Sequence, residues 1–141
     1  NLKEKTYFYK IIVPSLLEFK NWSIMINKPY DLEERTFLFA NECRTYIRTL
    51  PKTTSNIEDG KQLVRSSGSV GANYIEANEK LGDKDLIFRL KISRKEAKES
   101  KFWLRLLHES NPDQRTLSNS LLFEVEELRK ILSAIITKTS K

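Results

Sequence analysis

The chain has 141 residues, 39% of them apolar, with only four glycines and four prolines, which suits one compact helical domain with a single core. A single cysteine, Cys43, excludes an internal disulfide bond and gives no reason to expect an oxidising compartment, so we predict a cytoplasmic protein. The net charge of +6 is compatible with a nucleic-acid or acidic partner but is too small to establish one.

Residues 1–24 precede Met25, the only methionine, and two interpretations of them stay open. They are either upstream or cloning-derived sequence before a native start at Met25, or a genuine extension. The apolar run 11–17 is interrupted by Pro14 and has no small-residue cleavage site after it, so it does not resemble a signal peptide. It is also too short to span a bilayer, and we expect no membrane association. We therefore predict a non-native or disordered extension over residues 1–24 and a helical domain over residues 25–141.

The first predicted helix of the domain runs from about residue 32 to Leu50. Asp31 is a suitable N-cap, and the two glutamates that follow lie in the first turn, where the helix dipole favours acidic side chains. Pro51 ends the helix.

The second predicted helix follows a link at residues 53–56, is capped by Ser55 or Asn56, and continues to about Lys80. Between residues 66 and 73 it carries almost no side-chain bulk. A helix that gives up volume over two turns allows another backbone to approach closely, so we predict tight helix packing at this segment.

The third predicted helix runs over 84–109 after a Gly-Asp pair at 82–83, and Asn-Pro at 111–112 ends it because the residue before proline avoids the helical region. The fourth covers about 117–137, with apolar residues spaced by three and four. No segment alternates with a period of two, so we expect no strand. Short connections favour antiparallel neighbours, and the predicted fold is an all-α, antiparallel up-down four-helix bundle.

Three stretches carry a resemblance to a known family. The run SVGANYIEA at 69–77 and the run RKEAKESKFWL at 94–104 fall on the second and third predicted helices, and NKPYDLEERTFLFA at 27–40 opens the domain. In this order they resemble the four-helix-bundle proteins named after open reading frames in intervening sequences of bacterial 23S rRNA genes. The resemblance covers about residue 25 to the end of the chain.

The resemblance implies a small helical bundle that assembles into a ring, with a homopentamer favoured. A relative within this group is an accessory protein of diversity-generating retroelements, which binds nucleic acid and a reverse transcriptase. The resemblance therefore implies three partners for this chain: further copies of itself, RNA or DNA, and a reverse transcriptase or other nucleoprotein.

The residue types that usually carry catalysis are isolated in this sequence. His108 is the only histidine, and a surface or helix-end role explains it better than a general base. Cys43 falls on the apolar face of its helix, where a buried, inert thiol is the commoner state. The glycines of SSGSVGAN match no phosphate-binding loop, because no Lys-Ser/Thr pair follows and no strand precedes them. We predict no enzyme activity, metal or cofactor.

Two polar stripes lie on the second and third helices. The stripe on the third helix includes charged residues and lies in the middle of an apolar arc. These charged residues cannot be buried without a partner, since desolvating a lone charge costs several kcal/mol. Three interpretations are open: a satisfied polar network between helices or subunits, a ligand cleft built on Asn73, Glu76, Arg89 and Glu96, or solvated residues at the lumen of a ring. The stripes comprise Gln62, Ser66, Ser69, Asn73 and Glu76 on one helix and Arg89, Ser93, Glu96 and Ser100 on the other.

A basic stripe covers about a third of the circumference of the third helix, opposite its apolar arc. It is either an ordinary solvated face or, repeated around a ring, a positive belt that binds phosphate backbones without sequence preference. Phe102 and Ile87 fall within this arc and could contact a neighbouring subunit or a base. The stripe comprises Lys84, Lys91, Arg94, Lys95, Lys98, Lys101 and Arg105, extended by Lys61 and Arg65 of the second helix.

The sequence thus favours a non-enzymatic, oligomeric accessory protein that binds nucleic acid or nucleoprotein with weak sequence specificity. The alternative is a scaffold that recognises a protein and never touches nucleic acid. A third hypothesis is an enzyme that uses the polar seam.

Overall fold

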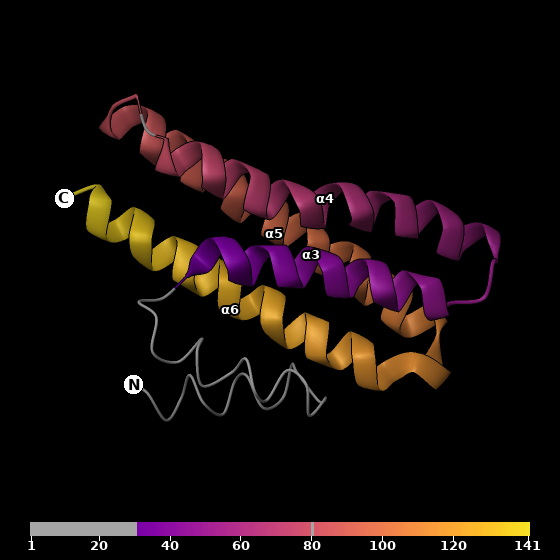
Figure 1. Ribbon diagram of the computed structural model, residues 1–141. Helices are drawn as coiled ribbons and strands as arrows, with labels where there is room; N and C mark the ends of the chain where they lie inside the picture. The colour runs from indigo at the N-terminus through magenta and orange to yellow at the C-terminus, as the bar shows by residue number, and fades with distance from the viewer. Residues whose placement is uncertain (1–30, 80) are drawn as a thin grey trace. The chain divides into compact units, whose positions relative to one another are not determined.

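The computed structural model of the protein describes residues 31–79 and 81–141, and over these residues it contains four α-helices, one 3-10 helix and no strand (Figure 1). The predicted all-α class with four helices is confirmed. The elements are α3 (Leu32–Thr49), α4 (Thr54–Asn78), α5 (Asp83–Ser110), η1 (Pro112–Gln114) and α6 (Arg115–Thr139). The predicted extension at residues 1–24 lies outside the described residues.

The start of α4 differs from the sequence prediction. Its N-cap is Thr53, whose Oγ1 accepts a hydrogen bond of 3.2 Å from the backbone N–H of Asn56. The prediction that Ser55 or Asn56 caps this helix was therefore wrong. The Asn56 side chain instead donates to the carbonyl of Pro51 at 2.9 Å and closes the link from the preceding helix.

The helices α5 and α6 also begin earlier than predicted. Gly82 is the N-cap of α5 with a φ of 155°, a left-handed conformation that favours glycine, so the helix already starts at the next residue. At the other end, η1 forms directly after Asn111, and the N–H of Gln114 donates to the Asn111 carbonyl at 3.1 Å. This turn carries the chain into α6 two residues before the predicted start at Leu117.

Contacts between residues far apart in the sequence show which parts of consecutive helices lie side by side. In each pair, residues nearer the start of one helix lie beside residues nearer the end of the other, as Glu33 of α3 and Asn78 of α4 do at 3.1 Å. The contacts are Arg44 with Val64 for α3 and α4, Asn56 with Asn111 and Ser93 with Val70 for α4 and α5, and Arg94 with Ser133 and His108 with Ser118 for α5 and α6.

Apolar side chains from all four helices form the core of the described domain. Burying one large aliphatic or aromatic side chain contributes about 1.5–3 kcal/mol, so this set supplies most of the driving force for packing. Its largest buried members are Phe39, Tyr46, Leu63, Val70, Leu90, Leu104, Leu107, Val125, Leu128 and Leu132.

The predicted close packing at the small residues of α4 is confirmed, and the partner is α3. A Cβ atom added to Gly71 would lie 2.9 Å from Oγ1 and 3.2 Å from Cβ of Thr36. A Cβ atom on Gly60 would lie 3.3 Å from a side-chain carbon of Ile47. The glycines therefore let the two helices pack at a distance that larger side chains would prevent.

Candidate nucleic-acid interface

The outward side of α5 combines cations with exposed apolar side chains. At 3.6 residues per turn these residues share an arc of about 100°. We call this set the outer face of α5, and it comprises Lys84, Phe88, Lys91, Lys95, Lys98, Phe102, Arg105 and Leu106.

The five cations of the outer face, Lys84, Lys91, Lys95, Lys98 and Arg105, are all exposed, and none forms an ion pair with a carboxylate of the described residues. From the first to the last they extend over about 30 Å along the helix axis at 1.5 Å per residue. That length is comparable to about one turn of duplex DNA, roughly 34 Å.

The other four cations of the predicted stripe have partners within the protein. Lys61 lies 3.0 Å from Glu58, and Lys101 lies 3.1 Å from Glu126 of α6. Arg65 of α4 pairs with both Glu96, at 3.4 Å, and Glu99 of α5. Arg94 donates to the Ser133 hydroxyl of α6 at 3.3 Å and is only partly exposed. Arg65, Lys101 and Arg94 therefore join neighbouring helices, whereas the Lys61 pair lies within α4.

Two of the acids that pair with these cations, Glu126 and Glu99, have a lowered pKa and stay ionised at neutral pH. Hydrogen bonds from Arg129 and then Lys101 lower the pKa of Glu126 to about 2. A hydrogen bond from Arg65 holds the pKa of Glu99 below its usual range. Lys61, Arg65 and Lys101 are therefore each offset by at least one acid, and the positive potential of α5 comes mainly from Arg94 and the five unpaired cations of the outer face.

The aromatic residues of the outer face are suited to contact a flat or apolar partner. Phe88 is 58% and Phe102 is 52% exposed. The Phe102 ring meets the Trp103 ring edge-on, with centroids 5.0 Å apart, and the Trp103 Nε1–H donates to Glu99 at 3.2 Å. Such rings serve equally as stacking surfaces for bases and as anchors in protein interfaces. Ile87, which the sequence analysis grouped with Phe102, is only partly exposed.

Four residues of the predicted polar stripes meet between α4 and α5. The hydroxyls of Ser66 and Ser100 lie 2.9 Å apart, and the Ser93 hydroxyl donates to the carbonyl of Val70 at 2.6 Å. The Glu96 side chain is buried and lies beside Arg65. Each of these polar groups therefore has a partner on the other helix, which is a hydroxyl, a backbone carbonyl or a guanidinium.

The remaining members of the stripes lie apart from that cluster. Gln62 and Glu76 are exposed, while Ser69, which is partly exposed, accepts a hydrogen bond at its backbone carbonyl from Asn73 of the same helix at 2.9 Å. Arg89 lies 3.8 Å from Asp85, one turn earlier on its own helix. Within the described residues, no hydrogen bond or ion pair joins any two of the four side chains of the hypothetical cleft, Asn73, Glu76, Arg89 and Glu96.

The two residues weighed for catalysis have structural neighbours. His108 Nδ1 lies 2.6 Å from the Ser118 hydroxyl and links α5 to α6. The Cys43 thiol is buried, and burial raises its pKa, so the thiol stays protonated and is a poor nucleophile. Among the described residues no group of histidine, cysteine and acidic side chains could hold a metal ion.

Sequence reasoning missed two buried polar pairs and a basic end. Asn56 and Asn111 donate to each other's side-chain oxygen at 2.8 Å, and Arg35 Nε donates to Glu124 at 2.7 Å. The position of Glu124 beside the apolar residues of α6 was the only sequence signal for the second pair.

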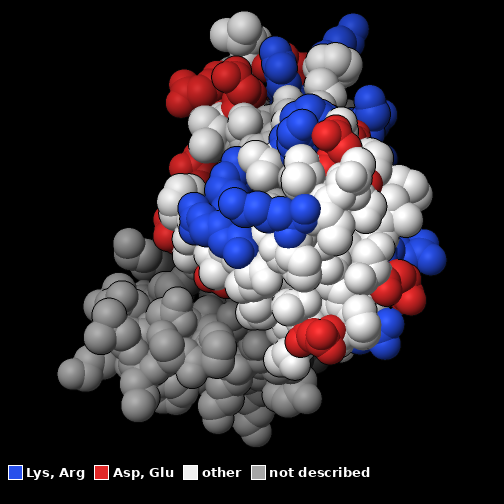
Figure 2. All heavy atoms as spheres, turned by 90° about the vertical axis from the view of Figure 1, so that its right-hand side faces the viewer, with Lys and Arg blue, Asp and Glu red and all other residues white. Residues whose placement is uncertain are grey.

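Figure 2 faces the end of the helices where the α3–α4 link and η1 lie, and Lys and Arg gather there. Arg48 and Lys52, both exposed, flank that link.

The described residues define an all-α protein. Its α5 helix carries exposed cations and exposed aromatic side chains on one face. No described helix is long and apolar enough to cross a membrane.

The chain belongs to the 23S rRNA-intervening sequence protein family, whose model matches residues 28–134. It is also similar to a crystal structure of a protein of unknown function from the S23 ribosomal protein family of Bacteroides thetaiotaomicron. The two chains are 30% identical with a TM-score of 0.68, and the match covers 75% of this chain and 98% of the other. No curated protein matches this chain.

Proposed function

We propose that this protein is a non-enzymatic, oligomeric accessory factor that binds RNA or DNA, or a nucleoprotein such as a reverse transcriptase complex, with weak sequence specificity. The observation that carries the proposal is the row of five exposed, unpaired cations on the outer face of α5. Cations that release counterions from phosphates supply affinity without reading bases. Such a partner would be met in the cytoplasm, the location that the sequence predicts.

The unit of assembly in this proposal is an antiparallel up-down bundle, and the assembly is a ring, with five subunits favoured by the family resemblance. The alternating directions of consecutive helices support the topology. The exposed aromatic residues support self-association, because monomers rarely leave several large apolar side chains on one face. A ring would repeat the row of cations around its circumference and multiply the number of phosphate contacts.

The test of binding is a fluorescence-anisotropy titration with generic single- and double-stranded RNA and DNA at two salt concentrations. Changing Lys91, Lys95 and Lys98 together to glutamate should abolish binding, because each lost phosphate contact removes counterion release. Changing the same residues to glutamine should weaken binding less and flatten its salt dependence. The fold should persist, since surface substitutions typically change stability by less than about 0.5 kcal/mol each.

The matched control changes Lys130, Lys138 and Lys141 to glutamate, which alters the net charge equally at exposed positions in and just after α6. This control should retain most of the affinity. Equal losses in both triple variants would show that binding follows net charge and not the outer face of α5. No binding by wild type at low salt would refute the nucleic-acid proposal.

The second candidate function is a protein scaffold, and the exposure of Phe88 and Phe102 favours it. A scaffold would bind its partner through these rings, and its affinity would change little with salt. We also propose that the polar residues between α4 and α5 are structural, because their hydrogen bonds are made within the protein. An enzyme built on that seam would need them free to meet a substrate.

A further inference from the structure

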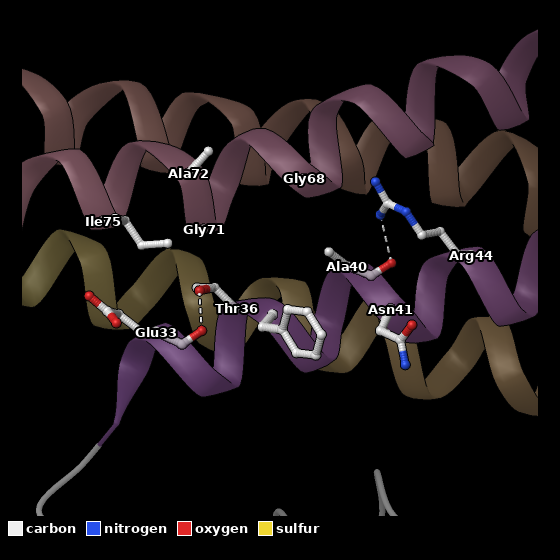
Figure 3. A pocket seen from close by; sticks show the side chains of 10 residues that line it. Glu33, Thr36, Ala40, Asn41, Arg44, Gly68, Gly71, Ala72 and Ile75 are labelled. Atoms are coloured by element: carbon white, nitrogen blue, oxygen red, sulfur yellow. Dashed lines mark hydrogen bonds between the residues drawn. The ribbon is translucent and has the colours of Figure 1, made fainter.

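A cavity of about 370 Å³ opens between α3 and α4, and we call it the α3–α4 cavity (Figure 3). Two glycines, Gly68 and Gly71, lie along it and leave its inner wall without side chains. Phe37 and Ile75 stand at its rim and are 62% and 48% exposed. The cavity thus combines an apolar lining with room for a large side chain from another molecule.

The surroundings of the α3–α4 cavity are acidic on the side where α4 ends, while the cation Arg44 lines the cavity at its opposite end (Figure 3). Glu33 lines the cavity, and Glu76 and Glu79 follow Ile75 by one and four positions; all three are exposed. The outer face of α5 carries the opposite pattern. Phe88 projects between Lys84 and Lys91, each about one turn away along the helix. An apolar cavity with acidic surroundings on that side and an aromatic side chain between two lysines are complementary in shape and charge.

The two surfaces also lie at one level of the bundle. Ser93 of α5 lies beside Val70 of α4, and Ser100 lies beside Ser66. Because the helices run in opposite directions, Phe88, five positions before Ser93, lies close to the level of Ile75 and Glu76. In a ring whose rotation axis runs along the helices, neighbouring copies meet at equal levels.

We propose that Phe88 of one copy inserts into the α3–α4 cavity of a second copy, where Lys84 and Lys91 face Glu76 and Glu79. The inference rests on the self-association in the proposed function and names the surfaces that make it. The contact is heterologous, since the inserted ring and the cavity are different surfaces of the same chain. Each copy therefore offers one of each, and repetition produces a ring when the rotation between neighbouring copies closes and a filament when it does not.

This interface leaves part of the basic surface free for nucleic acid. Lys98 and Arg105 lie about a quarter of a turn around α5 from Phe88, on the side toward α6. The inserted ring therefore does not bury them. One helix would serve both contacts, with its aromatic edge toward the neighbouring subunit and its basic edge toward solvent.

The test uses two variants that each destroy one half of the contact, Phe88→Glu and Ile75→Glu, with mass measured by light scattering. Both residues are exposed, so each variant should fold with the helix content of wild type, and each alone should be monomeric. Mixing them should give a heterodimer and nothing larger, because the intact Phe88 of one variant meets the intact cavity of the other. A matched control, Leu117→Glu at another exposed apolar position on α6, should assemble as wild type does.

Exchanging the charges of the two lysines and the two glutamates gives an independent test of the same contact between copies. Lys84→Glu with Lys91→Glu, and Glu76→Lys with Glu79→Lys, should each weaken assembly at low salt, and the four changes together should restore it. Wild-type mass for Phe88→Glu, or no heterodimer on mixing, would overturn the inference while leaving the self-association intact. A monomeric wild type would instead refute the self-association itself, and nucleic-acid binding is measured separately by anisotropy.

Discussion

At the scale of single residues, the most consequential finding is the buried ion pair between Arg35 and Glu124. The Arg35 Nε lies 2.7 Å from a Glu124 oxygen, and both side chains are less than a tenth exposed. Burial raises the pKa of Glu124 to about 7, although Arg35 opposes the shift. A buried pair of this kind is expensive to desolvate, so its net contribution to stability is small, while removing one partner is costly.

The raised pKa predicts how stability varies with pH. A carboxyl whose folded-state pKa lies above its unfolded value stabilises the protein while it is protonated, and that contribution is lost as pH rises through about 7. Melting temperature should therefore fall between pH 5 and pH 8.5. Glu124→Gln, which cannot titrate, should show a flatter profile. Thermal melts of both proteins across this range test the assignment, and parallel profiles would show that another group titrates.

At the scale of elements, the packing of α3 on α4 depends on glycines of α4, which have no side chain to keep the helices apart. Gly71 permits the Thr36 side chain to lie against the backbone of α4, and Gly68 faces only the end of the Arg44 side chain. A Cβ on Gly71 would meet atoms fixed close to a backbone. A Cβ on Gly68 would meet the far end of a flexible side chain. The two glycines should therefore respond differently to substitution.

We expect Gly71→Leu to destabilise the fold by about 1–3 kcal/mol through overpacking against Thr36. Gly68→Ala is the matched control and should be neutral or stabilising, because alanine is favoured over glycine in a helix by up to about 1 kcal/mol. Urea unfolding of the two variants measures the difference. Equal stability of wild type and Gly71→Leu would remove close packing as the reason for glycine at this position.

The outer face of α5 shows why a pattern on one helix does not assign a function. Nine cations were grouped by helical spacing, but Lys61, Arg65 and Lys101 pair with acids, and Arg94 bonds to a serine of α6. Charges that are neutralised within the protein contribute little to attraction at a distance. Arg94 keeps its charge beside a neutral serine, so it and the five exposed, unpaired cations are the ones on which a nucleic-acid partner would depend.

At the scale of the whole molecule, the prediction concerns mass. If the exposed aromatic side chains of α5 pack against other copies, the protein should scatter light as a stable oligomer at low micromolar concentration. Its mass should be about five times the 16.5 kDa of one chain. The mass should not depend on concentration in this range, because a buried aromatic interface is strong. A stable species of 16.5 kDa would contradict the prediction.

The sequence by itself determined the helical class, the four helices of the described residues and the family. Apolar residues at spacings of three and four define each helix locally, and Pro51, Gly82 and Pro112 mark the breaks between helices. The close packing at Gly71 was also predictable, because missing side-chain volume can be read without knowing the partner. The helix ends were less well predicted, because Thr53 caps α4 through a bond to Asn56, while Ser55 and Asn56 nearby are residue types that cap helices equally well.

Only the tertiary structure decided which polar residues are partners. Helical spacing places Glu96, Ser93 and Ser100 on one side of α5, but the register against α4 determines that Arg65 reaches Glu96 and that Ser66 reaches Ser100. The pairs Asn56 with Asn111 and Arg35 with Glu124 join residues 55 and 89 positions apart, which no local pattern connects. Burial and pairing depend on neighbours in space, so the identity of the free cations and the shape of the α3–α4 cavity emerge only when the helices pack.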